Sequence, residues 1–398
     1  MNIGVLKEIK QDERRVALQP SQARALSSLA HNIYVESGAG ERAGFSDADY
    51  QASGAKIVRK DEVLARARLL LKVKAPLRSE YDDYAPHHIL FTYLHFDENI
   101  SSQDLSELIS RGFLGIAYEW VGKAGHYPLL EPMSKLTGYL FAQRALELCS
   151  QEKGVFCARN EDLLLPGGRA LIVGCGNIGL SAFKYLSDLG VALTVIVTRG
   201  GEDFNRKANA RFGTEGIDYV GTTRTNLVTM NSKDPSRTQH TISALLPETD
   251  IVLNCAVRRP NLPKRRMEYL IDRSMVRRMQ KGSIICDCTA CDNDMIETCT
   301  SSALLYDSYR EEGVVHYNCD HIPSLVANTA TRLLTARTFA YIQYIAHLDS
   351  LQAITQDENL RNGVCCYRGH LTHALSAEKK GLPYRPLTDV IEALSSAA

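Results

Sequence analysis

The chain has 398 residues, and at roughly 100 to 200 residues per domain this length indicates two or three domains. We expect two. Its composition, 44% hydrophobic and 23% charged, is that of an ordinary globular protein. The 46 basic residues balance 46 acidic ones, so charge gives no support for a nucleic-acid or other polyanionic partner.

The sequence contains no segment typical of export or membrane insertion. Its first residues lack the basic-then-apolar layout of a signal peptide, and no uninterrupted apolar run reaches the ~18 residues that a membrane span needs. The eleven cysteines are odd in number and scattered, which favours free thiols in a reducing compartment over a disulfide framework. We therefore expect a soluble, cytoplasmic protein without a membrane partner.

The first part of the chain alternates strand-like and helix-like segments, which predicts a mainly parallel α/β sheet. The predicted elements are strands at 3–5, 33–36, 69–73 and 89–94, and a helix at 21–30. A long helical pattern over 132–152 forms the expected bridge to a second α/β series, which begins beyond 163–168.

The second series opens with a complete βαβ unit, composed of a strand at 170–173, a helix at 178–189 and a strand at 192–197. Further strands are expected at 251–254 and 283–286. The polar segment 221–247 has no strong periodicity and is predicted to be a surface insertion.

A Gly-x-Gly-x-x-Gly motif follows the first strand of this unit and opens its helix. The glycines permit a tight turn and close approach of a pyrophosphate, and the helix N-terminus offers unpaired N–H groups to the phosphates. The motif therefore predicts a dinucleotide site. The residues expected to contact the cofactor are Gly174, Gly176, Asn177, Ile178 and Gly179.

The end of the second strand bears on the choice of cofactor. Sites that prefer NAD usually carry a carboxylate there for the adenosine ribose, whereas this chain has Thr198 and Arg199, with more basic residues at 206–207. Arginine suits a 2′-phosphate, so NADP(H) is favoured over NAD(H). The other interpretation is a solvated arginine, with Glu202 or Asp203 binding the ribose.

Cys288 and Cys291 form a C-x-x-C pair, which could belong to a redox or zinc site. A zinc site would need a second ligand pair at suitable spacing, and the remaining candidates are irregularly spaced. Buried thiols near a strand end are the favoured interpretation, and no metal is expected.

Several separated segments resemble the alanine dehydrogenase and nicotinamide nucleotide transhydrogenase family, whose relatives include saccharopine dehydrogenase and N5-(carboxyethyl)ornithine synthase. The resemblance spans nearly the whole chain. The segments that carry it are 4–8, 13–18, 36–40, 44–47, 72–76, 91–95, 116–119, 128–134, 367–372 and 381–384.

The resemblance implies an α/β protein of two domains, with a Rossmann dinucleotide-binding domain inserted in a discontinuous α/β substrate domain. We expect the substrate domain at 1–135, the Rossmann domain at 136–305, and the return to the substrate domain with a C-terminal tail at 306–398. A homo-oligomer is also implied.

The resemblance further implies roles for individual residues. Arg15 would hold the substrate carboxylate, although the residue pattern alone would place it on the surface; Lys74 would also contact the substrate. Lys74 and His95 would be catalytic, because hydride addition to an imine needs a cation to polarise it and a group that titrates near neutrality. The residues implied at the cofactor are Ser134, Cys255 and Val257.

Two segments depart from alanine dehydrogenases. The family's second aspartate after the strand at 283–286 aligns with either Cys291 or Asp292, and Asp292 is the catalytic candidate. The family's Asn-Met-Pro-Gly is replaced by residues 320–325, which resemble saccharopine dehydrogenases, and His321 is expected to contact the substrate.

We therefore expect an NAD(P)(H)-dependent oxidoreductase that makes an amino acid from a 2-oxo acid and ammonia. An opine-type imine reductase, which joins a 2-oxo acid to an amino-acid amine, is the alternative. A catalytically silent nucleotide-binding paralogue is the alternative of another class.

Overall fold

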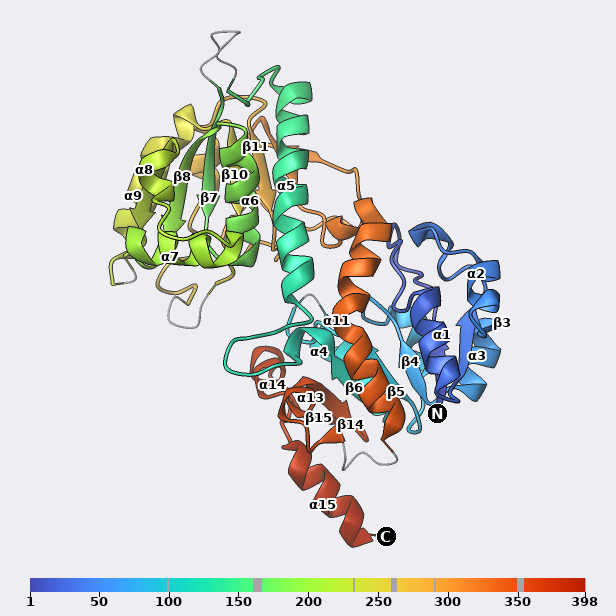
Figure 1. Ribbon diagram of the computed structural model, residues 1–398. Coiled ribbons are helices and arrows are strands. Elements are labelled where there is room, and N and C mark those ends of the chain that lie inside the picture. Colours follow the sequence, from blue (N-terminus) through green and yellow to red (C-terminus); the bar gives the residue numbers. More distant parts are fainter. Residues whose placement is uncertain are drawn as a thin grey trace. The chain divides into compact units, whose positions relative to one another are not determined.

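The computed structural model describes residues 1–98, 100–159, 167–231, 233–258, 263–289, 291–348 and 354–397. The chain divides into two compact units. The first unit contains Met1–Met133 and Ser324–Ala398, and the second unit contains Ser134–Pro323. The two-domain α/β organisation expected from the sequence is confirmed, with the second unit inserted into the first (Figure 1).

In the described part of the first unit the strands form one sheet of eight, in the order β15-β14-β6-β5-β4-β1-β2-β3. Strands β1 to β6 are parallel, and β14 pairs antiparallel with β6 and β15. The strands are β1 (Asn2–Val5), β2 (Asn32–Glu36), β3 (Lys56–Val58), β4 (Leu69–Leu71), β5 (Ile89–Thr92), β6 (Leu114–Ala117), β14 (Val364–Tyr367) and β15 (His370–Leu371).

The helices of the first unit begin where local residues favour a helix start. Pro20 occupies the first turn of α1, and the hydroxyls of Ser46 and Ser101 cap α2 and α4. Helix α3 packs on β1 and β2. These helices are α1 (Pro20–Ser28), α2 (Asp47–Ala52), α3 (Lys60–Arg66), α4 (Ser102–Ser110), α11 (Ala327–His347), α13 (Glu358–Gly363), α14 (Ala374–Lys380) and α15 (Leu387–Ala397).

The second unit has a described sheet of seven strands, in the order β12-β13-β11-β10-β7-β8-β9. All neighbours are parallel except β12 and β13, and the order 3-2-1-4-5-6 of the parallel strands is that of a Rossmann fold. The strands are β7 (Arg169–Val173), β8 (Ala192–Val197), β9 (Thr225–Thr229), β10 (Ile251–Asn254), β11 (Ile284–Asp287), β12 (Tyr309–Glu311) and β13 (Val314–Tyr317).

Helices alternate with these strands along the chain, and α6 packs on β7 and β8. The chain passes from the first unit to the second within α5, a helix of 22 residues. The helices are α5 (Glu131–Glu152), α6 (Asn177–Asp188), α7 (Gly201–Phe212), α8 (Tyr219–Thr222), α9 (Pro235–Leu245) and α10 (Arg273–Val276).

Two expectations were wrong. The segment 221–247 is not a surface insertion, because it contains β9, which pairs with β8 at the edge of the sheet, and α9. The second unit also does not end at 305 but continues to Pro323, because β13 pairs with β11 and β12 pairs with β13. The second α/β series was expected to begin beyond residues 163–168. Part of that segment belongs to residues 160–166, which lie outside the described residues.

All eleven cysteines are free thiols. In the described residues, no helix is both long and apolar enough to cross a membrane.

Candidate functional site

In the first unit, three of the candidate side chains follow neighbouring parallel strands. Arg15 comes after β1, Lys74 after β4 and His95 after β5, and β1 pairs with β4, which pairs with β5. Parallel strands end at a common edge, and ligands of open α/β sheets bind outside the carboxyl ends. The fold therefore brings these three residues to one edge of the first sheet.

Arg15 is buried, with 4% of its surface exposed, and its guanidinium is paired with a buried carboxylate. Its Nε and Nη2 donate to the two oxygens of Glu13 at 2.7 and 2.6 Å, which is the bidentate geometry of a strong ion pair. The hydroxyl of Ser324 donates to Glu13 Oε1 at 2.6 Å. Burial raises the pKa of Glu13, but Arg15 and these hydrogen bonds outweigh it and hold the pKa at about 2.

The surface position that the residue pattern alone gave Arg15 is wrong, because Glu13 supplies the charge that makes its burial possible. The Nη1 atom of Arg15 is not used by Glu13 and contacts Met133 Sδ at 3.4 Å.

Lys74 is buried and its backbone is tied to both neighbouring strands. Its N–H donates to Glu8 Oε1 at 3.2 Å, and its carbonyl oxygen accepts from the Thr92 hydroxyl at 3.0 Å. These bonds fix the point from which the lysine side chain leaves the sheet edge.

His95 has a left-handed backbone conformation, with φ of 50°, which is uncommon for a residue other than glycine. The backbone N–H groups of His95 and Leu94 both donate to the Glu119 carboxylate, at 2.6 and 3.1 Å respectively. The Nδ1 atom lies 3.1 Å from Glu98 Oε2. Burial lowers the pKa of His95, but Glu98 and Glu119 together raise it above its ordinary value. The two carboxylates thus stabilise the charged form of His95 relative to a free histidine side chain.

In the second unit the glycine motif forms the turn between β7 and α6, as expected. Gly174 has φ of 97°, and Gly176 is the N-cap of α6. A Cβ on Gly179 would collide with the carbonyl oxygen of Gly174, and one on Gly174 would lie 3.2 Å from the carbonyl oxygen of Cys255. The close-packed turn and the start of a 12-residue helix fit the pyrophosphate of a nicotinamide dinucleotide.

We expect Gly179→Ala to weaken dinucleotide binding by at least about tenfold, a loss of about 1.4 kcal/mol, because the Gly174 carbonyl must move. The fluorescence change of NADH on binding measures this. Gly201→Ala is the control, since its Cβ would meet Leu227 at 3.6 Å, an ordinary contact. An unchanged dissociation constant in Gly179→Ala would exclude this turn from the nucleotide site.

The remaining cofactor candidates lie at the same carboxyl edge of the second sheet or in α5. Thr198 and Arg199 follow β8 and are exposed, and Arg199 forms no hydrogen bond or ion pair with the described residues. Arg206 and Lys207 are instead paired with Asp203, at 2.6 and 2.9 Å. The others are Cys255, partly buried beside the glycine turn; Val257, exposed; and Ser134, in the first turn of α5.

The two alternatives for the family aspartate have different surroundings. Asp292 is exposed and its Oδ1 accepts the N–H of Ser301, whereas the Cys291 thiol is partly buried and lies 3.6 Å from the Thr289 carbonyl. A carboxylate that the sequence did not single out, Asp287, ends β11 and is buried, and burial raises its pKa to about 6.

His321 is fully buried after β13, and its Nδ1 is hydrogen-bonded to Asp320 Oδ1 at 2.6 Å. Among the described residues, the group with ligand atoms close enough to hold a metal ion is formed by Cys319, Asp320 and His321. The 2.6 Å separation is a hydrogen-bond distance, shorter than that between two ligands of one tetrahedral zinc ion. The geometry is therefore that of an Asp–His pair.

Four carboxylates around the first-unit candidates, three of them buried and one, Glu98, exposed, were not identified from the sequence. Glu8 and Glu119 accept backbone N–H groups of Lys74 and His95, which are distant in the sequence. Glu13 and Glu98 pair with the near neighbours Arg15 and His95. The only sequence signal for them is their place just after predicted strands or near the candidates.

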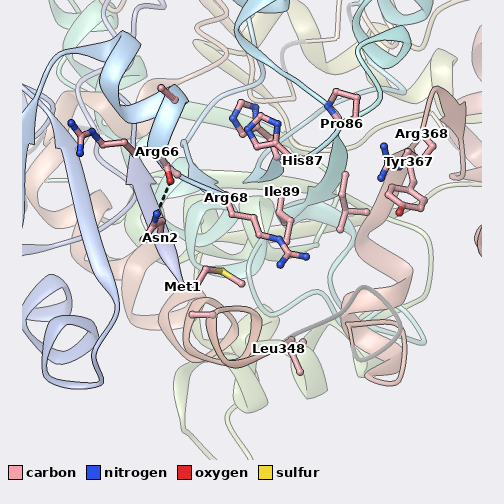
Figure 2. Close-up of a pocket in the computed structure, with 15 residues that line it drawn as sticks. Met1, Asn2, Arg66, Arg68, Pro86, His87, Ile89, Leu348, Tyr367 and Arg368 are labelled. Carbon is pink, nitrogen blue, oxygen red and sulfur yellow. Dashed lines mark hydrogen bonds between the residues drawn. The ribbon is translucent and has the colours of Figure 1, made fainter.

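The first unit contains a cavity of about 650 Å³. Arg66, Arg68, His87 and Arg368 are among the residues that line it (Figure 2). It also borders Ile89, the first residue of β5. The cavity therefore lies at the amino ends of the strands, at the opposite edge from Lys74 and His95.

Comparison with known proteins agrees with this geometry. Residues 4–137 match the N-terminal domain of the family described as alanine dehydrogenase/PNT, and residues 151–374 match its C-terminal domain. The chain belongs to the alanine dehydrogenase/PNT family. The resemblance expected from the sequence is confirmed.

Relatives of this family are similar over their whole length. The alanine dehydrogenase of Bacillus subtilis (strain 168) is 32% identical, with all of both chains covered. That of Methanococcus maripaludis is 32% identical over 97% of this chain and 98% of its own. A solved L-alanine dehydrogenase is 30% identical with a TM-score of 0.78, covering 95% of this chain and 99% of its own.

Proposed function

We propose that the chain is an alanine-dehydrogenase-like oxidoreductase, which interconverts an amino acid with a 2-oxo acid and ammonia by means of a nicotinamide cofactor. The observation that carries the proposal is the gathering of the Glu13–Arg15 pair, Lys74 and His95 at one edge of the first sheet. The full-length similarity to enzymes named alanine dehydrogenase supports it.

In this proposal each residue has a separate task. Arg15 Nη1, which Glu13 leaves available, binds the substrate carboxylate. The Lys74 ammonium polarises the carbonyl or imine of the substrate, and His95 supplies or accepts the proton as water leaves and the amine forms. The glycine turn at Gly174 and Gly179 would hold the nicotinamide cofactor, which would supply hydride in one direction of the reaction and take it up in the other.

The cofactor part of the proposal is a preference for NADP(H) over NAD(H). It is supported by Arg199, an exposed guanidinium beside the expected ribose position that has no partner among the described residues. Arg206 and Lys207 give less support, because Asp203 already neutralises part of their charge.

Arg199→Gln is expected to weaken NADPH binding roughly tenfold or more, since charge-assisted hydrogen bonds contribute about 1.5–3 kcal/mol. NADH binding, measured by fluorescence on the same variant, is the internal control and is expected to change less than about twofold. An equal loss for both cofactors would refute a 2′-phosphate contact at Arg199.

Absorbance at 340 nm tests the function itself. Purified protein is mixed with NADPH or NADH and with pyruvate or other 2-oxo acids plus ammonia, and then with ornithine or lysine in place of ammonia. Turnover with ammonia supports the proposal, and turnover that requires the second amino acid would replace it with the opine-type activity. Absence of turnover in every mixture, with nucleotide binding intact, would favour a silent paralogue.

Two further parts of the proposal, a homo-oligomer and a cytoplasmic location, rest on the resemblance to the family and on the free thiols.

A further inference from the structure

Glu8 is a buried carboxylate at the carboxyl edge of the first sheet that has no place in the proposed chemistry. It follows β1, and only 6% of its surface is exposed. Its Oε1 accepts the N–H of Val73 at 2.6 Å and the N–H of Lys74 at 3.2 Å. A single carboxylate oxygen of Glu8 therefore binds the backbone of Val73 and Lys74, which come shortly after β4.

The same two residues are held from the opposite side by β5. The Val73 carbonyl oxygen accepts the N–H of Tyr93 at 3.2 Å, and the Lys74 carbonyl oxygen accepts the Thr92 hydroxyl at 3.0 Å. With Glu8, the Lys74 backbone is bonded at both its N–H and its carbonyl. The stem of the lysine side chain thus starts from a fixed point.

Glu8 itself is held by a buried chain of charges. Lys72 is 1% exposed, and its Nζ lies 2.7 Å from Glu80 Oε1 and 3.5 Å from Glu8 Oε2. Glu80 Oε2 accepts the N–H of Leu77 at 2.9 Å. Lys72 is thereby fixed between two carboxylates, and its charge offsets part of the cost of burying Glu8.

This arrangement is costly for a structural support. Burial raises the pKa of Glu8, and Lys72 reverses only part of that effect. Burying two carboxyl groups and one ammonium carries a desolvation penalty that apolar side chains of similar volume would avoid. What an apolar side chain could not do is accept the two N–H groups at Val73 and Lys74.

We propose that Glu8, anchored by Lys72 and Glu80, is a positioning residue that sets the place of Lys74 in the reaction without touching the substrate. The inference rests on the proposed function, because it concerns the proposed catalytic lysine. A misplacement of about 1 Å at a reacting group can cost about 100-fold in rate, so an anchor at the lysine backbone governs turnover.

The test compares Glu8→Met with Glu36→Met. Glu36 ends β2 and its Oε2 accepts the N–H of Lys7 at 2.8 Å, so it makes the same kind of bond without holding a proposed catalytic residue. We expect kcat to fall about 100-fold in Glu8→Met, while KM for the oxo acid and the dissociation constant of the cofactor change less than about threefold. Glu36→Met is expected to keep kcat within about threefold of the wild type.

Glu8→Gln provides the conservative rescue, because its carbonyl oxygen can still accept both N–H groups, and we expect it to lose less than about tenfold in kcat. If Glu8→Met does not fold, Glu8→Asp serves instead. Its side chain is one methylene too short to reach both N–H groups, and it is expected to lose at least about tenfold. Retention of full kcat in Glu8→Met or Glu8→Asp, or an equal loss in Glu36→Met, would overturn the proposal.

A readout independent of turnover separates this inference from the proposed function. Lysines are dimethylated with 13C-labelled formaldehyde and a borane reductant, and the Lys74 signal is identified by its loss in Lys74→Arg. We expect this NMR signal to shift in Glu8→Met and not in Glu36→Met, even if no substrate mixture reacts. An unshifted signal would refute positioning by Glu8, whereas a shifted signal with an inactive wild type would refute only the proposed function.

Discussion

His95→Ala is expected to lower kcat by about 10²–10⁴-fold, the usual contribution of a general acid–base group, and to leave the dissociation constant of the cofactor unchanged. The physical reason is the surroundings of the ring. Glu98 and Glu119 hold the pKa of His95 above its ordinary value, and the Glu119 carboxylate, which accepts the His95 backbone N–H, fixes the unusual backbone conformation of His95. Initial rates at saturating substrate, with cofactor binding measured by fluorescence, provide the check.

His87→Ala is the matched control for this experiment. His87 is an exposed histidine that lines the cavity of Figure 2, at the opposite edge of the same sheet. We expect its substitution to leave kcat within about twofold, because surface changes away from a site seldom exceed ±0.5 kcal/mol. Unaltered turnover in His95→Ala would remove His95 from the mechanism, and equal losses in both variants would indicate a general structural effect.

Glu13→Ala is expected to reduce the free energy of unfolding of the first unit by about 3–5 kcal/mol, because it leaves the buried Arg15 guanidinium without its carboxylate. The single tryptophan, Trp120, belongs to this unit, so its fluorescence in urea reports the transition. Asp61→Ala removes an ion pair between largely exposed side chains, Arg59 and Asp61, and is expected to cost less than about 1 kcal/mol.

The Glu13 prediction carries a dependence on pH. The pKa of Glu13 falls from 4.5 to about 2 on folding, which corresponds to about 3 kcal/mol at 1.36 kcal/mol per pKa unit. This stabilisation is complete above pH 4.5 and is lost as the pH falls through 4.5 towards 2. The wild-type advantage over Glu13→Ala should therefore shrink in acid. An advantage that is constant from pH 7 to pH 3 would contradict the pairing.

Much of the fold is predictable from the sequence because parallel strands buried on both faces are short apolar runs. The strands at β1, β4, β5 and β7 follow such runs. Strand β9 escaped the prediction because its sequence, Thr-Asn-Leu-Val-Thr, is polar and only one of its residues is buried, as suits the edge of a sheet.

Some residues of the candidate site can likewise be predicted from the sequence and others cannot. The glycine motif could be predicted because its residues are contiguous and act through their own backbone. Lys74, His95 and Arg15 were found only through resemblance to the family. Glu8 and Glu119 were missed because each acts on residues far along the chain, at separations of 66 and 24 residues to Lys74 and His95. Only the pairing of strands brings such partners together.

The insertion of one unit within the other has a consequence for synthesis on the ribosome. The strand that covers β6, β14, begins at Val364, after the whole of the second unit has been translated. Until then β6, whose four residues are all buried in the finished sheet, presents an uncovered apolar edge, and such edges favour aggregation. The edge of β6 in the nascent first unit therefore stays uncovered until β14 has been synthesised, while the second unit can complete its own sheet earlier.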